Sequence, residues 1–453
     1  MLVIMIRSRL ETAEIDFLIK GGEQMNEKLF GKISQEVDAR EEELIELLTT
    51  LISFPTVSPP ARNTTGVQEF IKGYMEDLGF TTDMWDVYPG DPNVVGILRG
   101  ETPDQHNSLI VNGHVDVAEV GNHSEWDRSP FSAYLKDAFI YGRGVADMKG
   151  GIAASLIAIK ILKELGISLQ GDLQFQSVIG EEVGEAGTLA CLERGYSADY
   201  AVVVDTSDLH IQGQGGVITG WITIQSKETY HDGIRRKMIH AGGGVKGASA
   251  IEKMMKIMAG LQDLERHWAI TKSYDGFPPG TNTINPAVIE GGRHAAFVAD
   301  RCALWVTVHF YPDEDYEEVI MEIEKHIGAV ALADPWLREN PPQFVWGGKS
   351  MIVDRGEIFP SLEIDVEHPG TKLLADSYAK MSSHNPKVGM STTVTDAGWL
   401  GRAGIPTVIF GPGKLEDAHA VNEKVEIRQL LDFTKVLSVF IAEWCNSRKA
   451  GNK

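Results

Sequence analysis

The sequence of 453 residues contains only three cysteines, Cys191, Cys302 and Cys445. They are few, widely separated and odd in number, so they predict neither a disulfide framework nor a zinc site built on cysteine. Unpaired cysteines are typical of a reducing compartment, and we therefore expect a cytoplasmic protein.

Basic residues and long apolar runs are also scarce. Lysines and arginines number 42 against 64 aspartates and glutamates, which gives a formal net charge of -22. Nucleic acids and anionic membrane surfaces are bound by clustered cationic side chains, so this balance argues against both as partners. No stretch approaches the roughly 20 apolar residues that a membrane-spanning helix needs. Residues 1–25 have no pattern that we assign.

Segments with helical spacing of apolar residues alternate with short apolar runs that indicate buried strands. This alternation is typical of an α/β domain with a mostly parallel sheet. The predicted helices cover residues 37–53, 67–78, 150–165, 371–381 and 427–445, and the predicted strands cover 94–98, 108–117, 173–179, 201–204 and 407–410.

A second pattern interrupts the first. Strand, helix, two strands, helix and strand are predicted at residues 217–224, 248–261, 282–289, 303–310, 315–330 and 343–346. This order is that of a ferredoxin-like α+β unit. We therefore predict a catalytic domain in two parts, residues 26–213 and 367–453, with an inserted domain at residues 214–366.

One apolar run, residues 109–117, ends on a histidine and a carboxylate. Residues i and i+2 of a strand project to the same face, so His114 and Asp116 can point into one site. A carboxylate that holds the far nitrogen of an imidazole is common around bound metals. On its own, however, such a pair is more often a satisfied surface or core group.

Other polar residues follow strands or lie in loops of the same predicted sheet. Asp147 precedes a helix and could be an ordinary N-cap. Glu181 and Glu182 directly follow a strand and could form a solvated acidic loop, while Asp205 closes an apolar run and His419 lies in a loop. Together with His114, they supply the ligands for two divalent ions of the zinc class, with one glutamate left over as a base.

Four motifs resemble the M20 metallopeptidase family, which includes acetylornithine deacetylase, succinyl-diaminopimelate desuccinylase, aminoacylase and carboxypeptidase G. They are GHVD at 113–116, DMKGG at 147–151, GEE at 180–182 and AHAVNE at 418–423. The resemblance runs from about Glu42 to the end of the chain. It implies that Asp147 bridges two Zn²⁺ ions, or Co²⁺ or Mn²⁺ in their place. One ion would also bind Glu182 and His419, and the other His114 and Asp205.

The resemblance implies further roles. Asp116 would orient His114, Glu181 would be the general base, and a cis peptide would follow Asp147. The inserted domain would be a lid and a dimerisation domain of a homodimer. Its histidine, His240 in preference to His231, would reach the active site of the partner subunit.

The sequence departs from the family pattern in three places. Asp205 stands where deacylases usually have glutamate, the segment 229–238 is longer than usual, and no arginine precedes Pro312. Arg235 or Arg236 could grip a substrate carboxylate in its place. The turn that contains Gly411 and Gly413 is a further candidate for substrate binding.

These residues favour a zinc amidohydrolase that removes the acyl group of an N-acyl amino acid, such as acetylornithine. The alternative within the family is a dipeptidase or an aminopeptidase. The alternative of another class is a non-catalytic protein that binds metal or peptide on the same fold. A degenerate member would be expected to lose its base or a ligand, whereas every such position here holds a chemically competent residue.

Overall fold

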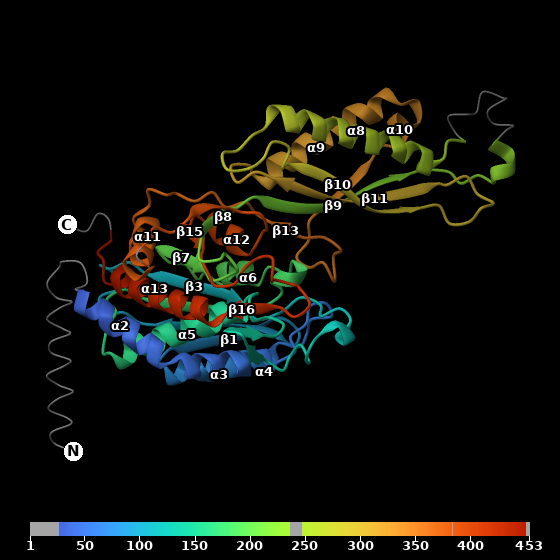
Figure 1. The fold of residues 1–453 in the computed structure, drawn as a ribbon. Helices are drawn as coiled ribbons and strands as arrows, with labels where there is room; N and C mark the ends of the chain where they lie inside the picture. Colours follow the sequence, from blue (N-terminus) through green and yellow to red (C-terminus); the bar gives the residue numbers. More distant parts are fainter. Residues whose placement is uncertain (1–26, 236–246, 383, 450–453) are drawn as a thin grey trace, which may run out of the picture. The chain divides into compact units, whose positions relative to one another are not determined.

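The computed structural model describes residues 27–235, 247–382 and 384–449. The residues that the sequence left unassigned lie outside these ranges. The chain forms two compact units, which are drawn in Figure 1. Unit 1 runs to Gly213 and resumes at Ile364–Ser391 and from Thr395, whereas unit 2 comprises Gln214–Glu363 and Thr392–Val394.

Unit 1 is built on an eight-stranded sheet with the order β1-β2-β6-β3-β7-β15-β8-β14. Its four central strands, β6, β3, β7 and β15, run parallel, whereas β1, β2 and β8 pair antiparallel with their neighbours. This confirms the predicted α/β class. The strands are β1 (Thr81–Tyr88), β2 (Asp91–Leu98), β3 (Leu109–His114), β6 (Leu173–Val178), β7 (Tyr200–Val203), β8 (Ile211–Gln214), β14 (Val388–Ser391) and β15 (Thr407–Ile409).

Helices cover both faces of this sheet, so the central strand β3 is buried throughout. A Cβ on Gly113 would lie 3.0 Å from Ile152 of α5, while the neighbouring Asn112 donates to Thr188 of α6 at 3.0 Å. Adjacent strand residues point to opposite faces, so α5 and α6 lie on opposite sides. The helices are α2 (Glu27–Ala39), α3 (Glu41–Ile52), α4 (Thr65–Asp77), α5 (Lys149–Glu164), α6 (Gly187–Glu193), α11 (Pro369–Ser382), α12 (Ala397–Arg402) and α13 (Ile427–Cys445).

A small sheet completes unit 1 beside the main one. Its three strands are antiparallel in the order β16-β5-β4. They are β4 (Tyr134–Lys136), β5 (Phe139–Tyr141) and β16 (Lys424–Glu426). Strand β5 leads into the turn before α5, and β16 leads directly into α13.

Unit 2 has the predicted order of strand, helix, two strands, helix and strand. Its sheet has the order β10-β11-β9-β12 with β13 beside β9, and α8 and α9 lie along one face (Figure 1). Apolar side chains of the helices and of the inner strands form its core. The elements are β9 (Gly216–Gln225), α8 (Ala250–Thr271), β10 (Thr283–Gly291), β11 (Arg301–Phe310), α9 (Tyr316–Ala333), α10 (Pro335–Glu339), β12 (Gln343–Trp346) and β13 (Ile358–Phe359).

The structure contains several elements that the sequence did not predict, namely α2, α6, α10, α12, β4, β5, β8, β13, β14 and β16. Three further differences have a clear physical reason. Strand β3 ends at His114, so Asp116 lies beyond the strand that was expected to carry it. Strand β1 was not predicted, because none of its residues is buried and its apolar residues follow no period of two. Helix α8 continues ten residues past Leu261, because Leu264 and Trp268 extend its buried stripe.

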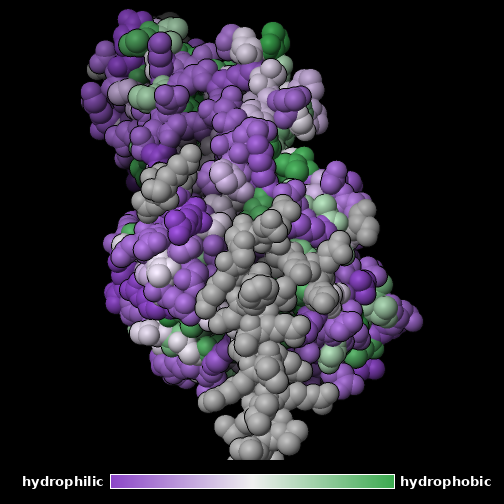
Figure 2. Space-filling view, turned by 90° about the vertical axis from the view of Figure 1, so that its left-hand side faces the viewer, coloured by the Kyte–Doolittle hydropathy of each residue, from purple (hydrophilic) through white to green (hydrophobic). Residues whose placement is uncertain are grey.

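The hydropathy of the surface is shown for one face of the molecule in Figure 2. On the face shown in Figure 2, most of the coloured surface is hydrophilic, and hydrophobic residues lie singly or in small groups. In the described ranges, no helix combines the length and the apolar character that crossing a membrane requires.

Candidate active site

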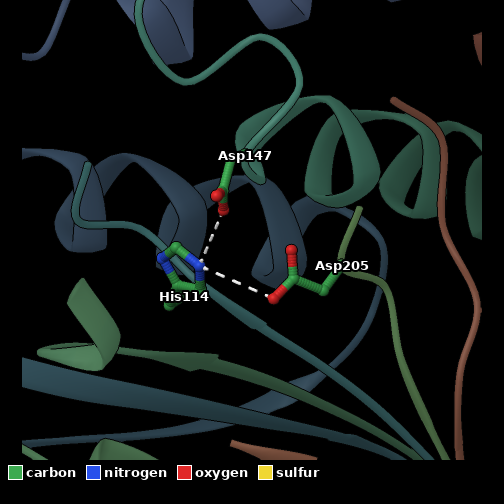
Figure 3. A group of neighbouring side chains, drawn as sticks. All are labelled: His114, Asp147 and Asp205. Carbon is green, nitrogen blue, oxygen red and sulfur yellow. Dashed lines mark ion pairs between the residues drawn. The ribbon is translucent and has the colours of Figure 1, made fainter. Parts of the chain in front are cut away.

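The predicted ligands of unit 1 meet at the carboxyl edge of the parallel strands. His114 is the last residue of β3, and Asp205 follows β7 by two residues. The imidazole Nε2 of His114 lies 3.2 Å from Oδ1 of Asp147 and 4.0 Å from Oδ2 of Asp205 (Figure 3). The first group of three is therefore assembled by two strand ends and the turn before α5.

A second group of three shares Asp147 with the first. The Nε2 atom of His419 lies 3.2 Å from Oδ2 of Asp147 and 2.9 Å from Oε2 of Glu182. In each group, the potential ligand atoms lie within 4.8 Å of one another. Asp147 thus directs one oxygen to each histidine, as a bridging carboxylate would.

This donor set fits a pair of divalent cations. The buried atoms Nε2 of His114 and Oε1 of Glu182 have no hydrogen-bond partner among the described residues. Buried polar atoms without a partner are costly, and a cation would satisfy both. Two imidazoles and three carboxylates are ligands of the zinc class, although they do not by themselves specify one metal.

The carboxylates repel one another in the absence of a cation. Burial and the charge of Asp147 raise the pKa of Glu182 to about 7 and that of Asp205 to about 6. Burial acts on Asp147 in the same direction, but its contacts with His114 and His419 hold its pKa below the usual range. The site therefore has an excess of negative charge, which a bound cation would offset.

Both histidines bind protons strongly in this surrounding. Hydrogen bonds with Asp147 and Glu182 raise the pKa of His419 to about 11. Burial lowers the pKa of His114, but its acidic neighbours, Asp116 and Asp147, outweigh burial and raise it well above the usual value. A metal ion would have to displace these protons.

Glu181 lies beside both groups and belongs to neither. Its Oε2 is 3.8 Å from Nε2 of His114. Burial raises its pKa well above the usual range, and the charges of Asp205 and Glu182 add to this effect. A carboxylate with a raised pKa next to a metal site is suited to accept and return a proton.

Asp116 holds the glutamate turn with its side chain and His114 with its backbone. Its Oδ1 accepts from the N–H of Gly180 at 2.8 Å, and its Oδ2 from that of Glu182 at 3.1 Å. The Nδ1 atom of His114 lies 3.0 Å from the backbone carbonyl of Asp116 and 3.5 Å from its carboxylate. The backbone therefore makes the shorter contact with the imidazole.

Comparison with known proteins agrees with this geometry. Residues 110–443 match peptidase family M20/M25/M40. The chain belongs to this family. N-formyl-4-amino-5-aminomethyl-2-methylpyrimidine deformylase of Halalkalibacterium halodurans is 61% identical over 414 residues, which are 91% of this chain and 97% of that protein. The protein of the same name from Bacillus subtilis is 60% identical over 425 residues, 94% of this chain and 100% of that one.

Solved structures have the same fold at low identity. The dipeptidase Dug1p of Saccharomyces cerevisiae has a TM-score of 0.66 and 17% identity, with 92% of this chain and 99% of that one covered. The aminopeptidase PepT of Bacillus cereus has a TM-score of 0.66 and 21% identity, with 89% and 98% covered. The family match and the two relatives confirm the resemblance to the M20 family, and the chain is an M20 hydrolase.

Two residues of this M20 hydrolase that the sequence did not single out support both ligand groups. The buried Arg143 donates to Oε2 of Glu423 at 2.6 Å and to the backbone carbonyl of His419 at 3.0 Å. Oε1 of Glu423 accepts from three backbone N–H groups in the turn that ends at Asp147, at 2.8 to 3.1 Å. Both lie in or near quoted motifs, but they are 280 residues apart, and nothing local indicates that they pair.

Two further predictions concern the cis peptide after Asp147 and the turn that contains Gly411 and Gly413. The peptide between Asp147 and Met148 is cis, as predicted. The backbone N–H of Gly411 donates to Ser207 and that of Gly413 to Gln429, both at 2.9 Å, so neither N–H is left for a substrate.

The predicted residues of the inserted domain lie in unit 2 or outside the described ranges. Arg235 forms an ion pair with Glu252 at 2.5 Å. His231 is exposed and its Nδ1 accepts from the N–H of Gly233 at 3.0 Å. Arg236 and His240 lie outside the described residues, so their roles stay predictions.

Proposed function

We propose that this M20 hydrolase is a metal-dependent deformylase that releases formate from N-formyl-4-amino-5-aminomethyl-2-methylpyrimidine. The observation that carries the amide hydrolysis is the pair of ligand groups that share Asp147, with Glu181 beside them. The substrate is supported by two relatives with this activity in their names, which are 61% and 60% identical over more than nine-tenths of the chain.

The reaction breaks the bond between the formyl carbon and the exocyclic nitrogen and adds water across it. Five residues would hold two divalent ions: His114, Asp147, Glu182, Asp205 and His419. Bound ions of this kind polarise a carbonyl and lower the pKa of water. Glu181 would take a proton from the attacking water and deliver it to the leaving amine.

One departure from the family pattern supports a substrate of this kind. Pro312 is preceded by Val308, His309, Phe310 and Tyr311, whereas many members have an arginine before this proline for a substrate carboxylate. The formylated pyrimidine has no carboxylate, so it does not require that arginine. An N-acyl amino acid such as acetylornithine does carry one, and we rank it second, followed by a dipeptide or an aminopeptidase substrate.

A substrate panel tests the proposal. The full chain is supplied with Zn²⁺, Co²⁺ or Mn²⁺ and assayed with the formylated pyrimidine, acetylornithine and a set of dipeptides. We expect formate release from the pyrimidine. Its N-acetyl analogue is the matched control and should react about 10- to 200-fold more slowly, because one additional methyl group has to be accommodated. Turnover of acetylornithine or a dipeptide without formate release would contradict the proposal.

The remaining parts of the proposal concern the assembled enzyme. We propose two Zn²⁺ ions per chain, a homodimer formed through the inserted domain, and a cytoplasmic location. The donor set and the scarcity of cysteine support the first and the last of these. Metal analysis and light scattering of the purified protein would test the ion count and the dimer, with fewer than one ion per chain or a monomer as contrary results.

A further inference from the structure

The turn that carries both glutamates is closed by a hydrogen bond between its two ends. Gly180 and Gly184 are in the left-handed region, with φ of 79° and 59°, and the N–H of Glu185 donates to the carbonyl of Gly180 at 2.7 Å. A Cβ on Gly180 would lie 2.4 Å from that of Glu185. The positions of Glu181 and Glu182 therefore depend on how this turn, residues 180–185, is held.

Arg62 holds the far end of the turn. Its two terminal nitrogens donate to the two carboxylate oxygens of Glu185 at 2.6 and 2.7 Å. The Glu185 side chain is 0% exposed, whereas that of Arg62 is 27% exposed. A two-point contact between guanidinium and carboxylate fixes orientation as well as distance.

Arg62 is itself fixed to the sheet. Its backbone is in the left-handed region at φ 64°, which is uncommon for a residue with a side chain. Asp91, the first residue of β2, accepts from the backbone N–H of Arg62 at 2.7 Å and from its side chain at 3.1 Å. The guanidinium also lies over the ring of Tyr88, 4.2 Å from its centre. The contact with Glu185 thus connects the turn to a rigid strand.

The near end of the turn is held independently by Asp116, through the N–H groups of Gly180 and Glu182. We infer that Arg62 is a positioning residue, which acts through Glu185 to hold Glu181 at the metal centre. The inference rests on the proposed function in that it takes Glu181 as the general base. Partners behind the reacting groups typically contribute about 10- to 100-fold, and a shift of about 1 Å can cost 10²-fold.

The kinetic test uses Arg62→Lys and Glu185→Gln. Lysine keeps the charge but not the two-point contact, and glutamine keeps the shape but not the charge. We expect kcat to fall about 10- to 100-fold in either variant with little change in KM. Arg99→Lys is the control, because it changes an ion pair of the same unit, with Asp172 at 2.5 Å, in which the arginine is largely exposed. Its kcat should stay that of the unaltered enzyme.

A double variant separates positioning from general stability. If Arg62 affects the rate by holding Glu181 in position, Arg62→Lys should have little or no effect on the residual rate of the Glu181→Gln variant. Equal losses in both backgrounds would overturn the inference, as would an unchanged kcat in both Arg62→Lys and Glu185→Gln.

Hydrogen exchange gives a readout that needs no substrate. In Arg62→Lys and in Glu185→Gln, peptides that cover residues 178–188 should exchange faster, while other peptides and the melting temperature change little. Unchanged exchange in this segment would overturn the inference. A full rate in Glu181→Gln alone would instead contradict the proposed function, and the exchange data would still decide whether Arg62 holds the turn.

Discussion

The two proposed groups of metal ligands share Asp147 but differ in how the fold supports them. The His114 side chain is 2% exposed and belongs to a central strand. The His419 side chain is 55% exposed and lies in a loop at φ 58°. The sheet therefore supports His114 of the first group, whereas the loop that carries His419 of the second is held by the buried pair of Arg143 and Glu423.

Two adjacent glutamates differ in their relation to these groups. Glu182 is a member of the His419 group, whereas Glu181 lies closest to the His114 group and is not a member of either. Neighbours in the sequence can thus have different chemical roles, because the short turn directs their side chains differently. The following predictions test this division, starting with the largest effect.

Glu181→Gln should lower kcat by about 10²- to 10⁴-fold, the usual contribution of a general acid or base, with the metal content unchanged. Glu182→Gln is the matched control and should lose the ion of the His419 group, because it removes a charged ligand. Rate measurements and metal analysis of both variants separate the two roles. Equal metal loss in both would contradict the division.

Asp116→Ala should weaken metal binding by about 10- to 100-fold. The variant keeps the backbone carbonyl that lies 3.0 Å from Nδ1 of His114, but the N–H groups of Gly180 and Glu182 lose their acceptor. We therefore expect the larger loss at the His419 group. Asp116→Asn, which retains one acceptor oxygen, should have an intermediate effect in a competition titration with a chelator. A loss confined to the His114 group would show that the carboxylate acts mainly on the imidazole.

The third prediction concerns the protons that metal binding releases from the site. The pKa of His419 is raised to about 11, so the metal-free protein holds this proton at neutral pH. A ligating imidazole must be neutral, so metal binding releases the proton. Affinity should therefore rise by about tenfold per pH unit for each proton released, and fall as the pH is lowered from 11 through the neutral range.

Calorimetry in buffers of different ionisation enthalpy would count the released protons. His419→Ala should release fewer than the unaltered protein, while His114 still contributes its own. An equal count in both proteins would show that His419 does not hold a proton in the metal-free state.

Much of the fold could be predicted from the sequence, because helices and buried strands have local periodicities. Most of the long helices and the buried central strands of both units followed from them, and so did the location of candidate ligands at strand ends. Strand β1 could not be predicted, because an edge strand without a buried residue has no such period. Likewise, the end of β3 at His114 depends on where its pairing with β6 stops.

The sequence by itself determined the family and the chemical types at the site: two histidines, the carboxylates and the additional glutamate that we propose as the base. Only the tertiary structure decided which atoms meet. It brings one oxygen of Asp147 to each histidine and brings the Asp116 carbonyl to His114. It also pairs Arg143 with Glu423 and Arg62 with Glu185, across 280 and 123 residues. Such contacts depend on chain segments that fold together from distant positions, and no local pattern encodes them.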